Sequence, residues 1–144
     1  MDKHTLKRKQ IIETAFKVWG EEFFYKTSLA SLAKALGISK TALYRYFRSK
    51  ESLIEEMRRV FLDVHRNICV EMAAEAEEKS FQQRLELFHT RFLQFYGENY
   101  WYYRFAFIFL LPHTAEGFHQ IEEIRRLQHG MFPAEQLEKE FGWG

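Results

Sequence analysis

Residues 27–53, TSLASLAKALGISKTALYRYFRSKESL, decide the fold of this chain, because they read as two short helices joined by a glycine turn. Leu29 and Leu32 belong to an apolar stripe at helical spacing, so one face of the first helix is expected to be buried. Ser28 is suited to cap the N-terminus of that helix. Gly37 falls where the chain must leave the helix with a positive φ, which glycine adopts at little cost.

The second helix of the pair follows directly. Ser39 is expected to cap it, and Leu43 and Phe47 are predicted to point back to the core. The side chains left available to solvent are Lys40, Thr41, Tyr44, Arg45 and Tyr46. Two helices with a tight turn form a helix-turn-helix, and the spacing Ala33-x3-Gly37-x5-Leu43 is typical of one. The small residue lets the helices approach, glycine turns the chain, and the leucine holds the second helix.

The same segment resembles the N-terminal domain of the TetR family of bacterial transcription regulators, over about residues 8–55. The resemblance implies a first helix behind the pair, a recognition helix at about residues 40–46 in the major groove of DNA, and a fourth helix that begins near Lys50. One departure is visible. The family usually has glycine where Phe23 stands, whereas here Gly20 comes earlier, which leaves the local geometry open.

The resemblance also carries roles over to particular positions. Thr27 and Ser28 correspond to phosphate ligands at a helix N-terminus, where amide groups and the helix dipole favour an anion. Lys40, Thr41 and Tyr44 stand where the family reaches base edges or the adjoining backbone, and Tyr46 and Lys50 resemble its backbone clamps. The predicted DNA-binding set is Thr27, Ser28, Ser39, Lys40, Thr41, Tyr44, Arg45, Tyr46 and Lys50.

The charge distribution agrees with a nucleic-acid partner. Residues 1–60 hold 13 Lys or Arg against 7 Asp or Glu, a net charge of +6, whereas residues 61–144 hold 8 against 13, a net charge of −5. A basic N-terminal part suits a polyanion, and the acidic remainder is expected to point away from it. A lysine-rich surface that is merely solvated is the alternative, and the helix-turn-helix pattern makes it the weaker one.

Periodicity predicts helices throughout, and hence an all-α fold in which a long fourth helix joins a three-helix head to a helical bundle body. The predicted helices span residues 5–22, 29–36, 40–46, 49–78, 80–97, 99–111, 115–129 and 133–141. The first of them is expected to bury one face, formed by Ile11, Ile12, Ala15, Phe16 and Trp19. The predicted domains are residues 1–48 for the DNA-binding head and 49–144 for ligand binding and dimerisation. Cys69 lies in the apolar register of the long helix, so a buried, inert thiol is expected.

Ten aromatic side chains lie between Phe92 and Leu111, on more than one helical face. In the resembled family this part of the chain forms an inducer pocket, which suggests a cavity for an apolar or aromatic small molecule; a core or a subunit interface is the alternative. The candidate ligand-binding residues are Phe61, Phe88, Phe92, Phe95, Tyr96, Trp101, Tyr103 and Phe107.

Catalytic and metal-binding motifs do not stand out. His113 and His119 are six residues apart, which does not bring them onto one helix face, and no nucleophile motif or phosphate-binding glycine loop occurs. We therefore expect no enzyme activity, cofactor or metal. The N-terminus lacks the apolar stretch of a signal peptide, and the longest apolar run, 105–111, is too short to span a bilayer, so a cytoplasmic protein is expected.

Taken with the resemblance, these patterns predict a ligand-responsive transcription regulator, a repressor that binds a palindromic operator as a homodimer. Family members usually continue into two more long helices that pair across the dimer, whereas this sequence ends after one short helical stretch. A fragment, an internally shortened chain, a compact member and a monomeric head are all open interpretations. The alternative function is a helical small-molecule-binding or protein-interaction module that keeps the helix-turn-helix as a scaffold.

Overall fold

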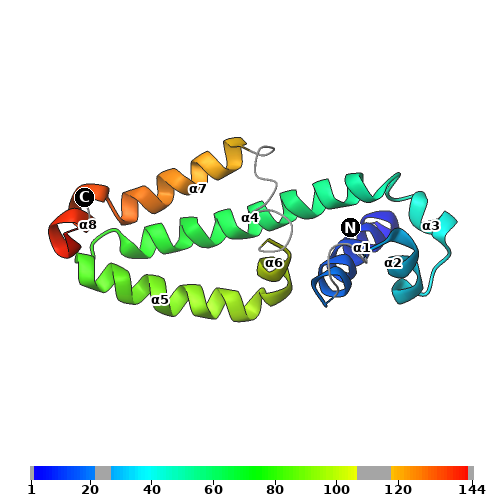
Figure 1. The fold of residues 1–144 in the computed structure, drawn as a ribbon, viewed down its shortest axis with the longest axis horizontal. Helices are drawn as coiled ribbons and strands as arrows, with labels where there is room; N and C mark the ends of the chain where they lie inside the picture. Colours follow the sequence, from blue (N-terminus) through cyan, green and yellow to red (C-terminus); the bar gives the residue numbers. More distant parts are fainter. Residues whose placement is uncertain (1, 22–26, 107–117, 143–144) are drawn as a thin grey trace. The chain divides into compact units, whose positions relative to one another are not determined.

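The computed structural model describes residues 2–21, 27–106 and 118–142, and the regular structure in these ranges is helical (Figure 1). The helices are α1 Lys3–Glu21, α2 Leu29–Leu36, α3 Lys40–Tyr44, α4 Lys50–Ala76, α5 Phe81–Glu98, α6 Tyr100–Phe105, α7 Phe118–Met131 and α8 Ala134–Phe141. The predicted all-α class is confirmed, with its helix-turn-helix head and long fourth helix. None of the described helices is long and apolar enough to cross a lipid bilayer.

Helix α1 supports the helix-turn-helix. It begins two residues earlier than predicted, because the Asp2 carboxylate accepts a hydrogen bond from the backbone amide of Thr5 at 2.7 Å. The same hydrogen bond lowers the pKa of Asp2. The buried face of α1 is the predicted one, formed by Ile11, Ile12, Ala15, Phe16 and Trp19. Gly20 is buried within the helix, while Phe23 lies outside the described residues.

Helices α2 and α3 form the predicted pair (Figure 1). The Ser28 hydroxyl accepts a hydrogen bond from the Ser31 amide at 3.0 Å, so Ser28 caps α2 as expected. Gly37 has a φ of 68° and ends the helix in the left-handed region, where a side chain would strain the backbone. Leu43 has no exposed surface and holds α3 against the core.

Helix α3 ends at Tyr44, two residues before the predicted end at residue 46. The amide of Arg45 donates to the carbonyl oxygen of Ala42, and the amide of Tyr46 donates to that of Leu43. These bonds span three residues rather than four, so the last turn is tightened and leaves the α-helical path. The other predicted helix ends that fall within the described residues agree with the observed ones to within two residues.

The chain forms two compact units, Met1–Phe61 with Trp101–His113, and Leu62–Tyr100 with Thr114–Gly144. The domain boundary placed after residue 48 stays a prediction. In the first unit, α6 packs against α1: the Phe16 ring lies 4.3 Å from that of Tyr102 and 5.0 Å from that of Phe105, between ring centroids. Arg104 donates a hydrogen bond to the Gly20 carbonyl oxygen, which adds a polar tie to this aromatic packing.

The second unit holds the rest of α4 together with α5, α7 and α8. An ion pair with a 2.8 Å hydrogen bond joins Arg66 of α4 to Glu123 of α7. Arg84 of α5 donates to the carbonyl oxygens of Ala76 at 3.2 Å and Met131 at 3.3 Å. One arginine therefore satisfies backbone acceptors at the C-terminal ends of two helices, where intrahelical donors are lacking.

Cys69 is buried in this second unit, as predicted. Its thiol lies 3.7 Å from Nε2 of His65, one helical turn earlier in α4. Burial raises the pKa of Cys69 to about 11. The reactive thiolate is therefore scarce at neutral pH, as expected for a thiol that serves only packing.

Candidate DNA-binding surface

A groove of about 340 Å³ lies where the N-terminus of α2, the helix α3 and the first turn of α4 meet. Its lining residues are Thr27, Ser28, Leu29, Ala30, Lys40, Tyr44, Arg48, Ser49, Lys50 and Glu51. Five of the nine residues in the predicted DNA-binding set line this groove. The sequence separates them by up to 23 positions, so the fold has brought them together.

Lys50 holds the two sides of the groove together. Its ammonium group donates a hydrogen bond to the Thr27 carbonyl oxygen at 2.9 Å, which ties the start of α4 to the residue before the α2 cap. The same nitrogen lies 5.8 Å from the centroid of the Trp19 ring, within the range of a cation–π contact. The positive charge of Lys50 thus lies at the groove, where the Thr27 carbonyl oxygen and the Trp19 ring both contact it.

The predicted base-reading residues lie on the exposed face of α3. Lys40 and Thr41 are exposed, and Tyr44 keeps 42% of its surface open to solvent. The Lys40 ammonium nitrogen lies 5.8 Å from the centroid of the Tyr44 ring, so these side chains share one patch. Ser39 is also exposed, but its hydroxyl accepts from the Ala42 amide at 3.0 Å and caps α3.

The predicted phosphate ligands occupy less open positions. Thr27 is only 6% exposed, so its side chain offers little surface to a phosphate. Ser28 is half-buried and its hydroxyl is engaged in the α2 cap. The groups at this end of α2 that suit an anion are the backbone amides of its first turn, to which Leu29 and Ala30 of the groove lining belong.

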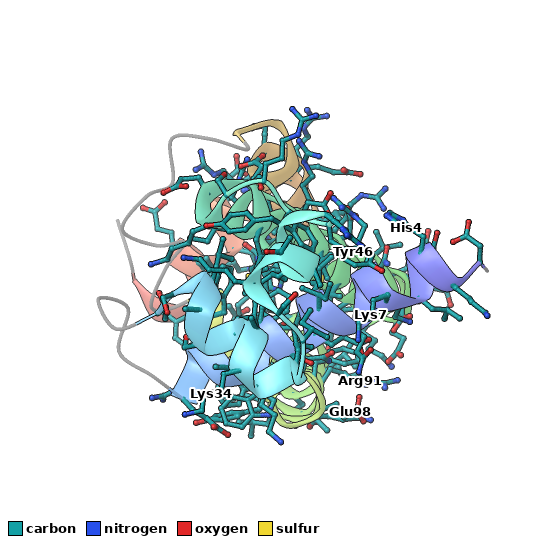
Figure 2. All side chains as sticks on the ribbon, turned by 90° about the vertical axis from the view of Figure 1, so that its right-hand side faces the viewer. His4, Lys7, Lys34, Tyr46, Arg91 and Glu98 are labelled. Carbon is teal, nitrogen blue, oxygen red and sulfur yellow. The ribbon has the colours of Figure 1, made fainter. Side chains whose placement is uncertain are left out.

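Arg45 and Tyr46 stand at the C-terminal end of α3 and do not line the groove. Arg45 is exposed. Tyr46 is half-buried and its ring stacks on that of His4 from the start of α1, with centroids 4.9 Å apart. Figure 2 shows the two side chains close together.

Sequence reasoning missed several residues of this surface. Arg48 adds a third cation to the groove beside Lys40 and Lys50, whereas Glu51 adds one carboxylate. Arg48 lies within residues 27–53, and its position two residues before Lys50 could have indicated a place beside the predicted DNA-binding residues. The stacking of His4 on Tyr46 has no such signal, because 42 positions separate the two residues.

The candidate ligand-binding residues belong to both compact units, and their role stays a prediction. Phe61 and Tyr103 are buried in the first unit with ring centroids 5.5 Å apart, and Trp101 belongs to the same unit. The candidates on α5 belong to the second unit, where rings follow one another along the helix; they are Phe88, Phe92, Phe95 and Tyr96. Phe107 lies outside the described residues.

These elements define a helix-turn-helix domain with a basic groove beside its second helix. Residues 11–57 match the family model described as bacterial regulatory proteins, tetR family. The resemblance to the TetR family is thereby confirmed over these residues, which are similar to the N-terminal domain of that family.

Curated relatives align with the N-terminal part of the chain. The uncharacterized HTH-type transcriptional regulator YuxN of Bacillus subtilis is 31% identical over 90 residues, which cover 61% of this chain and 31% of YuxN. The HTH-type transcriptional repressor KstR2 of Rhodococcus jostii is 35% identical over 57 residues, 40% of this chain and 28% of KstR2. The HTH-type transcriptional regulator RutR of Escherichia coli is 38% identical over 58 residues, 40% of this chain and 27% of RutR. The chain thus spans less than a third of the length of these relatives.

A solved structure extends the likeness beyond the head. The crystal structure of a protein from Shewanella sp. PV-4, described as a tetR family transcription regulator, superposes with a TM-score of 0.52 at 22% identity. The match covers 92% of this chain and 69% of the other. At this identity the likeness concerns the fold, and it agrees with the all-α architecture described above.

Proposed function

We propose that this protein is a sequence-specific DNA-binding transcription regulator. The observation that carries the proposal is the groove in which Lys40, Arg48 and Lys50 converge with the N-terminus of α2, in a domain that matches the tetR family model. Three cations and a helix N-terminus, set against one carboxylate from Glu51, suit a phosphate backbone better than any neutral partner.

Within this proposal the two parts of the surface have different roles. Lys40, Thr41 and Tyr44 read base edges in the major groove, because they project from the exposed face of α3. Lys50 and the amides at the start of α2 bind the phosphate backbone and set the register of α3. Arg45 and Tyr46, at the C-terminal end of α3, contact the phosphate backbone of the DNA.

We further propose that two copies bind a palindromic operator in the cytoplasm as a symmetric dimer and repress transcription. A single short helix reads too few base pairs for a unique site, and two heads about 34 Å apart would occupy successive major grooves. The tetR family match and the name of KstR2 as a repressor support this direction of control.

The same proposal includes an apolar or aromatic small molecule as effector. Phe88 and Phe132, with centroids 5.4 Å apart, line a groove of about 330 Å³ in the second unit, which offers ring surface to such a ligand. A ligand that favours one arrangement of the long helix would change operator affinity with a coupling of about 1–3 kcal/mol. A thermal-shift screen with lipophilic compounds should give stabilising hits, and failure across a broad library would remove this part of the proposal.

Selection of preferred duplexes from a randomised pool tests the central proposal. We expect a recurrent sequence to emerge and to bind more tightly than random duplexes. If each head neutralises about four phosphates, log affinity should fall with log salt by about 0.9 per contact. A scaffold that binds no specific site would show no sequence preference at any ionic strength, and that result would contradict the assignment.

A further inference from the structure

Arg8 of α1 contacts both the segment just after α3 and the helix α4 with one guanidinium group. Its Nη1 donates a hydrogen bond to the Tyr46 carbonyl oxygen at 2.6 Å, just beyond the end of α3. Its Nη2 donates to the Glu56 carboxylate on α4, forming an ion pair. The guanidinium carbon also lies 4.3 Å from the centroid of the buried Phe47 ring.

Helix α3 needs this support from outside. It has only five residues, and helices this short are not stable in isolation. Leu43 is its one buried residue, so the side chains within α3 supply a single core contact. The carbonyl groups beyond its last turn also lack intrahelical donors, and a cation there interacts favourably with the helix dipole.

We propose that Arg8 is a positioning residue that fixes the orientation of α3 relative to α4, and thereby sets the sequence preference of the head. This inference rests on the proposed DNA-binding function. Arg8 binds the chain just after α3 through Tyr46 and binds α4 through Glu56, so the two elements are held by one rigid, planar group. Lys40, Thr41 and Tyr44 then present their side chains to the base edges at a defined angle.

Arg8 and Glu56 carry opposite charges, so an experiment can distinguish a role in positioning α3 from simple electrostatic attraction to DNA. Removing Arg8 lowers the positive charge of the head, whereas removing Glu56 raises it. If the pair acted through charge alone, the two substitutions would shift DNA affinity in opposite directions and leave sequence preference unchanged. A positioning role requires both substitutions to reduce the preference, because each one breaks the same link between α3 and α4.

The experiment compares Arg8→Gln and Glu56→Ala with the matched control Lys9→Gln. Lys9 is the next residue of α1, carries the same charge as Arg8, and pairs with Glu13 of its own helix at 3.9 Å. Affinity is measured for a selected duplex and for a randomised duplex at several salt concentrations, and the ratio of the two is the readout. Circular dichroism at the assay temperature verifies that each variant is folded, and Arg8→Lys provides a milder variant that keeps the charge.

We expect Arg8→Gln and Glu56→Ala each to lower the affinity ratio by roughly tenfold, the effect of losing a charged hydrogen bond. Arg8→Lys should give a smaller loss, and Lys9→Gln should weaken binding to both duplexes without changing their ratio. A wild-type preference that persists in both test variants would overturn the positioning role and leave the proposed function intact. A wild-type protein without any preference would overturn both.

Discussion

Tyr44→Ala is expected to weaken binding to a selected duplex by roughly 5–150-fold, which corresponds to the 1–3 kcal/mol of a good base contact. The Tyr44 side chain is 42% exposed on α3 and shares its patch with Lys40, so truncation removes a large contact surface from the proposed interface. Because the side chain is not part of the core, the free energy of unfolding should change by less than about 0.5 kcal/mol.

Titration of the selected duplex against the wild type and the variant measures this effect. Tyr100→Ala is the matched control, because Tyr100 is 38% exposed and does not line the groove. Tyr44→Phe separates the hydroxyl group from the ring: a hydrogen bond to a base would be lost, whereas packing against DNA would be kept. Equal operator affinity in Tyr44→Ala and the wild type would argue against α3 as the reading helix.

The sequence predicted best those features that depend on residues close together in the chain. Ser28, Gly37 and Ser39 mark the ends of α2 and the start of α3, and each does so through its own backbone or a hydrogen bond three residues away. Such interactions are encoded within one helical turn. Periodicity likewise predicted the buried face of α1, because an amphipathic helix exposes its polar side whatever it packs against.

Contacts between distant segments could not be predicted in the same way. The Arg8 bonds to Tyr46 and Glu56 span 38 and 48 positions, and any of the basic residues near the N-terminus could have made them. The packing of α6 on α1 is a similar case. The segment from Tyr100 to Phe105 carries aromatic side chains on more than one face of the helix, so several helices could have packed against it. Composition indicates that they are buried but not against what.

The candidate DNA-binding and ligand-binding residues were likewise only partly predictable from the sequence. The groove contains Lys40 and Lys50, which the helix-turn-helix pattern indicated, but Arg45 does not line it and Thr27 is buried. The aromatic candidates also divide between the two compact units, since helical spacing places rings on a face and does not specify which helix will cover it.

Leu43→Ala is expected to lower the free energy of unfolding of the head by about 2–5 kcal/mol. Leu43 has no exposed surface and is the one buried residue of α3, so its truncation leaves a cavity beneath the helix that carries the proposed base contacts. The loss is large against the 5–15 kcal/mol that stabilises a typical domain. The matched control is Thr41→Ala, on the same helix but exposed.

Denaturant unfolding followed by circular dichroism gives the stabilities of both variants, and duplex titration gives their affinities. Thr41→Ala should weaken DNA binding with almost no change in stability, because it removes a contact and leaves the core intact. Leu43→Ala should lose stability first and lose DNA binding as a consequence, so lowering the temperature should restore part of its affinity but none of the affinity lost in Thr41→Ala. A free energy of unfolding for Leu43→Ala within about 1 kcal/mol of the wild-type value would show that the leucine does not anchor α3. The geometry from which the base-reading face was inferred would then be wrong.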